Sequence, residues 1–185
     1  MAEASPWDGF GIVLLDKSHN RASFSCGKLP LDEYLKKHAR QNDSKELTKT
    51  FVLLKGQSKD VCGYYSVRYG QVDFEELPEA ERKGLPRYPV PTFHLARMAV
   101  DDKFRGKGLR LGELLLFHAL RRALAASDAA GLYAIEVVAK DADAVGFYAK
   151  YQFQPLFDDS LHMYLPISAV RKLFIGQPPN SGQIE

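Results

Sequence analysis

The most constraining feature of this chain is a buried strand, a glycine-rich basic loop and a long helix in direct succession. The apolar run Phe93–Val100 predicts the strand, and apolar residues at helical spacing predict a helix from about Leu111 to Ala126. Between them lies Arg105-Gly106-Lys107-Gly108-Leu109-Arg110-Leu111-Gly112. A helix start leaves N–H groups unpaired and partially positive, and glycines let an anion approach the backbone. This succession therefore predicts a diphosphate site.

A plainer interpretation of the loop is a solvated basic turn whose glycines only reverse the chain. Spacing excludes two common nucleotide motifs. The P-loop pattern GxxxxGK[ST] is absent, and the dinucleotide pattern GxGxxG fails because Leu111 stands where its last glycine belongs. Context has to decide between a turn and another kind of phosphate site.

The other segments predict a single α/β domain over residues 1–175, followed by a flexible tail over 176–185. A first helix, whose apolar residues would be Leu31, Tyr34, Leu35, His38 and Ala39, carries a basic outer surface. The order is strand–helix, hairpin, strand–helix, strand–helix and hairpin. The further strands are expected at 10–15, 50–54, 61–67 with an extension toward 74, 131–138, 153–156 and 161–165, and a further helix at 142–151.

Composition narrows the class of protein. With 185 residues and 45% apolar side chains, the chain can build a core without a disulfide or metal. Its net charge of +2 does not fit a dedicated nucleic-acid coat, so any polyanion contact must be a local patch. The two cysteines and five histidines have no metal-ligand spacing, and we expect no metal. No secretory signal or membrane-length apolar run is present, which predicts a cytoplasmic protein without membrane contact.

Two segments resemble the GCN5-related N-acetyltransferases, the GNAT family. Leu95-Ala96-Arg97-Met98-Ala99-Val100-Asp101 and the loop at Arg105 resemble the family's acetyl-CoA site, whose loop reads [RQ]xxGx[GA]. The later segment 144–153 resembles its closing helix, with an Ala-x-x-Phe-Tyr-x-x-x-Gly-Phe pattern. Further matches between Phe24 and Pro166 are similar to the toxin branch, which acetylates aminoacyl-tRNA in type II toxin–antitoxin pairs. The resemblance implies a mixed, mostly antiparallel, splayed sheet flanked by helices.

The chain departs from the family pattern at two places. If the family pattern is aligned on Arg105, its final Gly/Ala position is occupied by Arg110. If it is aligned on Gly112, the loop contains two extra residues. We favour this enlarged loop because it keeps glycine at the helix start. Gln152 stands where the family has glycine, at a helix end that often needs a positive φ. That difference predicts local strain or a shifted turn.

The resemblance also implies roles for particular residues. By this resemblance, Tyr148 donates a proton to the departing thiolate. A phenol, with a pKa of about 10, stays protonated where a thiol, with a pKa of about 8.5, ionises, so it can hydrogen-bond the developing thiolate. The alternative is that Tyr148 is only one more buried aromatic residue. Backbone N–H groups near Met98, Ala99 and Val100 hold the thioester. The pyrophosphate of acetyl-CoA, the co-substrate, binds at Arg105, Gly106, Lys107, Gly108, Arg110 and Gly112.

A general base is harder to assign. His94 is a candidate, but it can equally be a packed or exposed strand residue. A base is dispensable for an aminoacyl ester, because its α-amine titrates below about 8, whereas a lysine near 10.4 would need more help. The pattern therefore favours an α-amine acceptor.

For tRNA, the candidate contacts are Lys36, Arg40, Arg87 and Arg97, although each alone is an ordinary solvated charge. The predicted partners are aminoacyl-tRNA, a ribbon-helix-helix antitoxin and a second copy of the chain in a homodimer. Two alternatives stay open: acetylation of a protein N-terminus or small-molecule amine, and a non-catalytic acetyl-CoA sensor.

Overall fold

The computed structural model describes residues 7–157 and 159–175, so the predicted tail over 176–185 lies outside the described residues. One sheet has the strand order β1-β2-β3-β4-β5-β7-β6. Of its neighbouring strand pairs, β4 with β5 is parallel and the others are antiparallel. The strands are β1 (Phe10–Leu14), β2 (Lys49–Lys55), β3 (Gly63–Val72), β4 (Val90–Val100), β5 (Ala134–Val138), β6 (Gln154–Leu156) and β7 (Asp159–Pro166).

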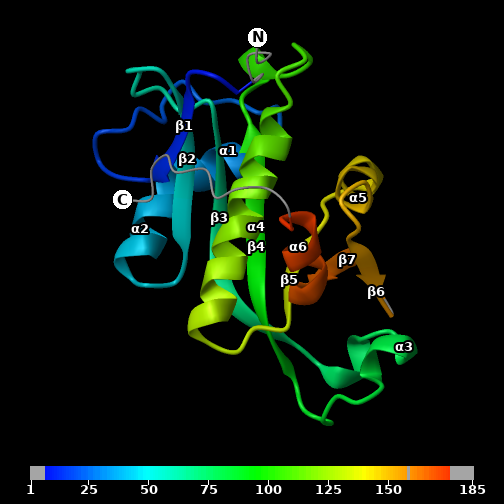
Figure 1. The fold of residues 1–185 in the computed structure, drawn as a ribbon. Helices are drawn as coiled ribbons and strands as arrows, with labels where there is room; N and C mark the ends of the chain where they lie inside the picture. The colour runs from blue at the N-terminus through cyan, green and yellow to red at the C-terminus, as the bar shows by residue number, and fades with distance from the viewer. Residues whose placement is uncertain (1–6, 158, 176–185) are drawn as a thin grey trace.

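Helices lie on both faces of the sheet (Figure 1). One face carries α4 (Leu111–Ala129) and α6 (Ile167–Leu173). The other face carries α1 (Leu29–Glu33), a π-helical segment (Tyr34–His38) and α2 (Ala39–Ser44) over β2, β3 and the end of β4. The short α3 (Glu79–Arg82) precedes β4, and α5 (Ala142–Ala149) follows β5.

The alternation of side chains along β3 explains the two cores. Tyr65 and Val67 point toward α4 and join the larger core, whereas Tyr64 points the other way and packs against Phe24 and Tyr34 beneath the first helices. Successive residues of a strand face opposite sides of the sheet, so a strand that is buried on both faces needs apolar residues at both its odd and its even positions.

The parallel pair β4–β5 separates partway along its length. Its register runs from Thr92 opposite Ala134 to Leu95 opposite Val137 and then stops. Strand β4 continues to Val100 along β3, with an irregularity that leaves Ala96 as an extra residue. The β5-facing backbone edge of residues 96–100 therefore has no sheet partner among the described residues.

The structure corrects the sequence expectations at several places. The π-helical segment adds a residue to one turn, so His38, predicted on the packed face, is exposed. The second hairpin strand ends at Val72 rather than near 74, and the helix predicted to reach 151 ends at Ala149. Helix α6 was not predicted. Within residues 7–157 and 159–175, no helix is both long and apolar enough to span a bilayer.

Candidate active site

The loop after β4 is held at its start and open in its middle. Asp101 is buried and accepts hydrogen bonds from the backbone N–H groups of Lys103 (2.9 Å) and Ser25 (3.1 Å). Beyond it, Gly106 and Gly108 have φ of +71° and +70°, and a methyl group at either would meet no atom within 4 Å. The left-handed backbone explains why glycine stands at both positions.

The backbone N–H groups of residues 106–112 have no acceptor in the described part of the chain. They lead into α4, which begins at Leu111, and Arg110 precedes it in a left-handed conformation with φ of +50°. Unpaired N–H groups and the positive end of a 19-residue helix form a binding site for a diphosphate. The residues present therefore fit the diphosphate of a nucleotide co-substrate.

The three cations of the loop have different surroundings. Arg105 is anchored, because its guanidinium donates to the Cys26 carbonyl at 2.8 Å and pairs with Asp102 at 3.1 Å. Arg110 pairs with Glu113 at 2.5 Å. Lys107 is exposed. The sequence analysis predicts that all three cations bind a phosphate. Arg105 in addition connects the loop to the chain segment before α1.

Met98, Ala99 and Val100 lie on the part of β4 that has separated from β5. The side chains of Met98 and Val100 pack toward α4, and Ala99 packs under the first helices. Backbone N–H groups on the free edge can therefore contact a ligand that lies between the two strands.

Tyr148 lies on α5, whose start is capped by Asp141 through the backbone N–H of Ala144 at 2.9 Å. Its ring packs at 5.2 Å from that of Phe147 and 5.4 Å from that of Phe153. Burial raises the pKa of Tyr148 above its ordinary value of 10. The phenol therefore stays protonated at neutral pH, as a proton donor must.

Gln152 adopts a left-handed conformation with φ of +69° after the end of α5. The N–H of Phe153 donates to the carbonyl of Tyr148 at 3.3 Å, which is a helix-end turn normally built on glycine. The predicted need for a positive φ is confirmed.

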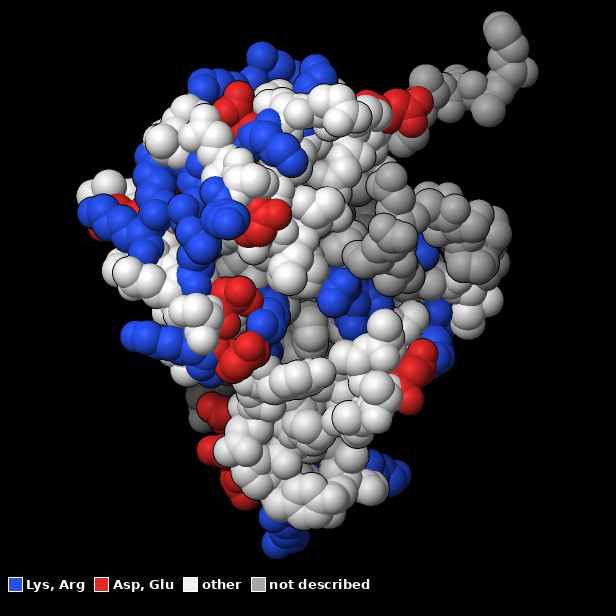
Figure 2. All heavy atoms as spheres, turned by 90° about the vertical axis from the view of Figure 1, so that its left-hand side faces the viewer, with Lys and Arg blue, Asp and Glu red and all other residues white. Residues whose placement is uncertain are grey.

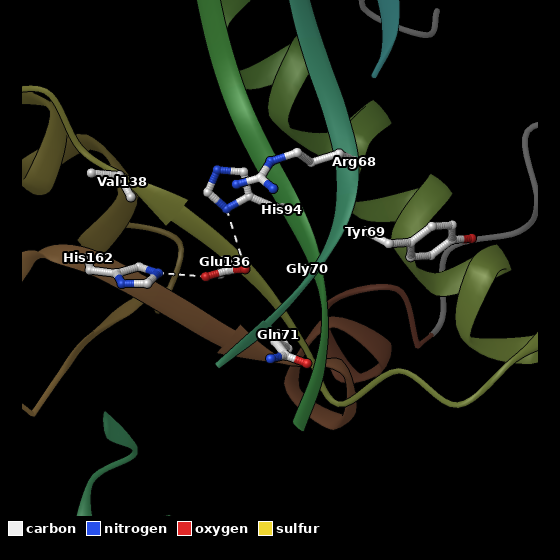
Figure 3. Close-up of a pocket in the computed structure, with 8 residues that line it drawn as sticks. All are labelled: Arg68, Tyr69, Gly70, Gln71, His94, Glu136, Val138 and His162. Carbon is white, nitrogen blue, oxygen red and sulfur yellow. Dashed lines mark hydrogen bonds and ion pairs between the residues drawn. The ribbon is translucent and has the colours of Figure 1, made fainter. Parts of the chain in front are cut away.

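An open pocket of about 600 Å³ lies on the sheet face opposite α4, lined from β3, β4, β5 and β7 (Figure 3). At its base the Glu136 carboxylate is hydrogen-bonded to His162 Nε2 at 2.5 Å and to Thr92 Oγ1 at 2.6 Å. His94 Nδ1 lies 3.4 Å from the same carboxylate. Burial would raise the pKa of Glu136, but the hydrogen bonds from His162 and Thr92, together with the nearby imidazole of His94, lower it to about 2.

The predicted tRNA contacts are only partly brought together. Lys36 and Arg40 are exposed on the π-helical segment and α2, on a face where Figure 2 shows Lys and Arg gathered. Arg97 stacks over the ring of Tyr34 at 4.0 Å, between that surface and the end of β4. Arg87 precedes β4 and so lies toward the other end of this 11-residue strand from Val100.

A family model described as an acetyltransferase (GNAT) domain matches residues 31–162. The chain belongs to the GNAT acetyltransferases. A tRNA-acetylating toxin of Mycobacterium tuberculosis is 37% identical over 151 residues, which are 82% of this chain and 88% of that protein. The predictions of the GNAT family, an acetyltransferase and its toxin branch are thereby confirmed.

Two solved structures are similar to this chain over almost their whole length. AtaT complexed with acetyl-methionyl-tRNAfMet has a TM-score of 0.82 at 25% identity, covering 89% of this chain and 99% of that one. AtaTR bound with acetyl-CoA has a TM-score of 0.78 at 26% identity, covering 90% and 99%. The predicted fold, a mixed and mostly antiparallel sheet flanked by helices, is confirmed.

Sequence reasoning missed Glu136 and His162. Each stands in a short strand among apolar residues, where one polar side chain carries little signal. A glutamate in the otherwise apolar run Ala134–Val138 was the one available indication, since a buried carboxylate needs partners.

Proposed function

We propose that this chain is an acetyl-CoA-dependent N-acetyltransferase that modifies the α-amino group of aminoacyl-tRNA and so blocks translation as a toxin. The similarity to a tRNA-acetylating toxin over most of both chains carries this proposal. The related AtaT complexed with acetyl-methionyl-tRNAfMet supports the class of acceptor, and AtaTR bound with acetyl-CoA supports the donor.

Acetyl-CoA is a substrate that supplies an acetyl group on a thioester. In this proposal, the N–H groups of residues 106–112 bind its pyrophosphate, with Arg105, Lys107 and Arg110 adding positive charge. The free edge of β4 at Met98, Ala99 and Val100 orients the thioester and polarises its carbonyl. The Tyr148 hydroxyl gives its proton to the sulfur as the thiolate departs.

The acceptor approaches from the sheet face opposite α4. Lys36 and Arg40 contact RNA phosphates there, and Arg97 extends the positive charge toward the end of β4. Burial lowers the pKa of Arg21, and repulsion from the charge of Arg40 lowers it further. Phosphate oxygens would relieve that repulsion. Arg87 is a separate, more distant proposed contact.

From the same resemblance we also propose a homodimer and a ribbon-helix-helix antitoxin as partners, and a cytoplasmic location, which a tRNA substrate favours. Light scattering of the purified chain tests the dimer. Co-expression with the product of an adjacent small reading frame tests the antitoxin, because growth should be restored only if that product binds the toxin.

The proposal is tested with radiolabelled acetyl-CoA and three RNA samples: charged tRNA, deacylated tRNA, and charged tRNA whose α-amine has already been formylated. We expect label in the first sample alone, released with the amino acid by mild base. Equal labelling of the formylated sample would contradict an α-amine acceptor. Label found only in protein or small molecules would contradict the tRNA acceptor.

A further inference from the structure

Glu136 is a carboxylate built into the middle of the sheet. It is 3% exposed and comes from the short strand β5, where its neighbours in sequence are buried and apolar. Burying a charge is costly unless partners satisfy it, and the two carboxylate oxygens have three: Thr92, His94 and His162, from β4 and β7. Its oxygens are therefore occupied, and any contact with a substrate falls to the histidines.

Gly70 on β3 makes room for this group. A methyl group at Gly70 would lie 2.8 Å from Glu136 Oε1 and 3.1 Å from Thr92 Oγ1, closer than side chains tolerate. The buried carboxylate thus depends on residues from four strands: space left by β3, and hydrogen-bonding side chains from β4, β5 and β7.

Three buried polar atoms on the strands around this cluster have no hydrogen-bond partner in the described part of the chain. One is His94 Nδ1, whose nearest acceptor is the Glu136 carboxylate at 3.4 Å. The others are the hydroxyl of Ser66, a residue that is 0% exposed, and the hydroxyl of Tyr164, which pairs with Glu136 across β5 and β7. Ser66 pairs with Arg97, and Arg68 pairs with His94, so Ser66 and His94 belong to adjacent strands. Buried polar groups are rarely left unpaired, which favours a Nδ1–H of His94 directed at the Glu136 carboxylate, the acceptor nearest to it.

The cluster lies where β4 and β5 begin to separate. His94 stands opposite Glu136, one pair before the last one at Leu95 and Val137. In Figure 3, Nδ1 of His94 faces Glu136, while the other ring nitrogen lies on the edge of the ring turned away from the carboxylate. The anion-binding loop lies with α4, on the other face. A nucleophile that enters between the strands from the open face therefore passes His94.

We propose that His94 Nε2 accepts the proton of the incoming amine and that Glu136 is the positioning residue that holds His94 in the required tautomer. The inference rests on the proposed function and adds the base that the sequence left open. With Nδ1–H directed at the carboxylate, the lone pair of Nε2 faces the pocket. His162 saturates the second carboxylate oxygen, which keeps Glu136 ionised.

The proposed acetyl-transfer step balances in protons and electrons. The amine nitrogen bonds to the acetyl carbon, the carbon–sulfur bond breaks, and its electron pair leaves with sulfur. His94 takes one N–H proton, and the Tyr148 hydroxyl gives one to sulfur. Solvent water then returns a proton from His94 to the Tyr148 oxygen, so both residues regain their starting states.

Titratable or charged groups on three neighbouring strands line the same pocket as His94. Arg68 lines the pocket from β3, Glu136 comes from β5 and His162 from β7. The hydrogen bond to Glu136 raises the pKa of His162 above its ordinary value, and the charges of Glu76 and Asp159 add to that shift. A fall in rate at acid pH must therefore be assigned with variants of both histidines.

The first test needs no acetyl-CoA. Long-range ¹H–¹⁵N spectra of the full chain distinguish the two tautomers of each ring, with His19, His38 and His118 as internal references. We expect neutral His94 to carry its proton on Nδ1, and Glu136→Gln to reduce that preference. His94 with its proton on Nε2 would overturn the proposal.

The second test compares single-turnover rates on charged tRNA. His94→Ala should lower the rate about 10²-fold, with binding of both substrates unchanged, and added imidazole should restore part of it. Imidazole should not restore Tyr148→Phe, and the exposed Glu79→Gln on α3 should match the wild type. A wild-type rate in a folded His94→Ala variant, or a loss that imidazole does not relieve, would overturn the assignment. A wild type inactive on charged tRNA would instead contradict the proposed function.

Discussion

Gly112, the second residue of α4, lies against the ring of Phe147 on α5: a methyl group added to Gly112 would be 3.8 Å from that ring. This contact brings the anion-binding helix start next to the helix that carries Tyr148. The proposed phosphate site and the proposed proton donor, 36 residues apart in the chain, are thus fixed relative to one another by packing rather than by sequence proximity.

Replacing Tyr148 with Phe should lower the rate of acetyl transfer without weakening the binding of acetyl-CoA. The ring remains in its aromatic cluster, but the thiolate loses its proton donor, so we expect the transfer rate to fall by roughly 10² to 10⁴. The dissociation constant of acetyl-CoA, measured by calorimetry, should stay within about twofold. A variant that transfers acetyl at the wild-type rate would reduce Tyr148 to a packing residue.

Gly108→Ala tests the loop. At φ of +70° an alanine is strained by about 1–2 kcal/mol, so the loop should shift and its N–H groups should no longer converge on an anion. We expect acetyl-CoA to bind roughly tenfold more weakly. Gly131→Ala is the matched control, because Gly131 has open space and no positive φ. Equal affinity of both variants would argue against a phosphate site at residue 108.

Lys36→Gln and Arg40→Gln test the RNA-binding surface. Each should reduce the slope of log binding constant against log salt concentration by about 1, because one phosphate contact is lost. Lys172→Gln on α6 removes the same charge from the other side of the sheet and should leave the slope unchanged. Arg87→Gln in the same series tests the distant fourth contact.

The burial of His118 predicts that the folded protein loses stability at acid pH. It is hydrogen-bonded to the Tyr65 hydroxyl at 2.6 Å, and burial, with the charges of Arg122 and Arg121, lowers its pKa to about 4. The unfolded chain therefore binds a proton there between about pH 6.5 and 4 that the folded chain does not, so stability falls as pH drops through this window. In denaturant titrations, His118→Gln should show a flatter pH dependence in that range. An unchanged slope would contradict a buried neutral His118.

Gln152→Gly should stabilise the domain. It removes a left-handed non-glycine residue, and we expect the free energy of unfolding to rise by about 1 kcal/mol. Lys150→Gly is the control, since Lys150 has right-handed helical angles and gains nothing from glycine. A destabilised Gln152→Gly variant would show that the glutamine side chain makes a compensating contact.

Sequence patterns predicted the strands, the loop and α4 because each rests on local periodicity and turn chemistry. They could not predict the π-helical segment at 34–38, since one extra residue per turn leaves no mark in composition. They also could not join His94, Glu136 and His162. These residues meet only because β5 lies between β4 and β7, an order that local patterns do not encode.

The most direct test of this account is a crystal structure of the chain with acetyl-CoA bound. We predict that the pyrophosphate accepts hydrogen bonds from the N–H groups of residues 106–112 and that the sulfur lies between β4 and β5, within about 3.5 Å of the Tyr148 hydroxyl. A thioester bound away from the free edge of β4, or a sulfur out of reach of that phenol, would contradict it.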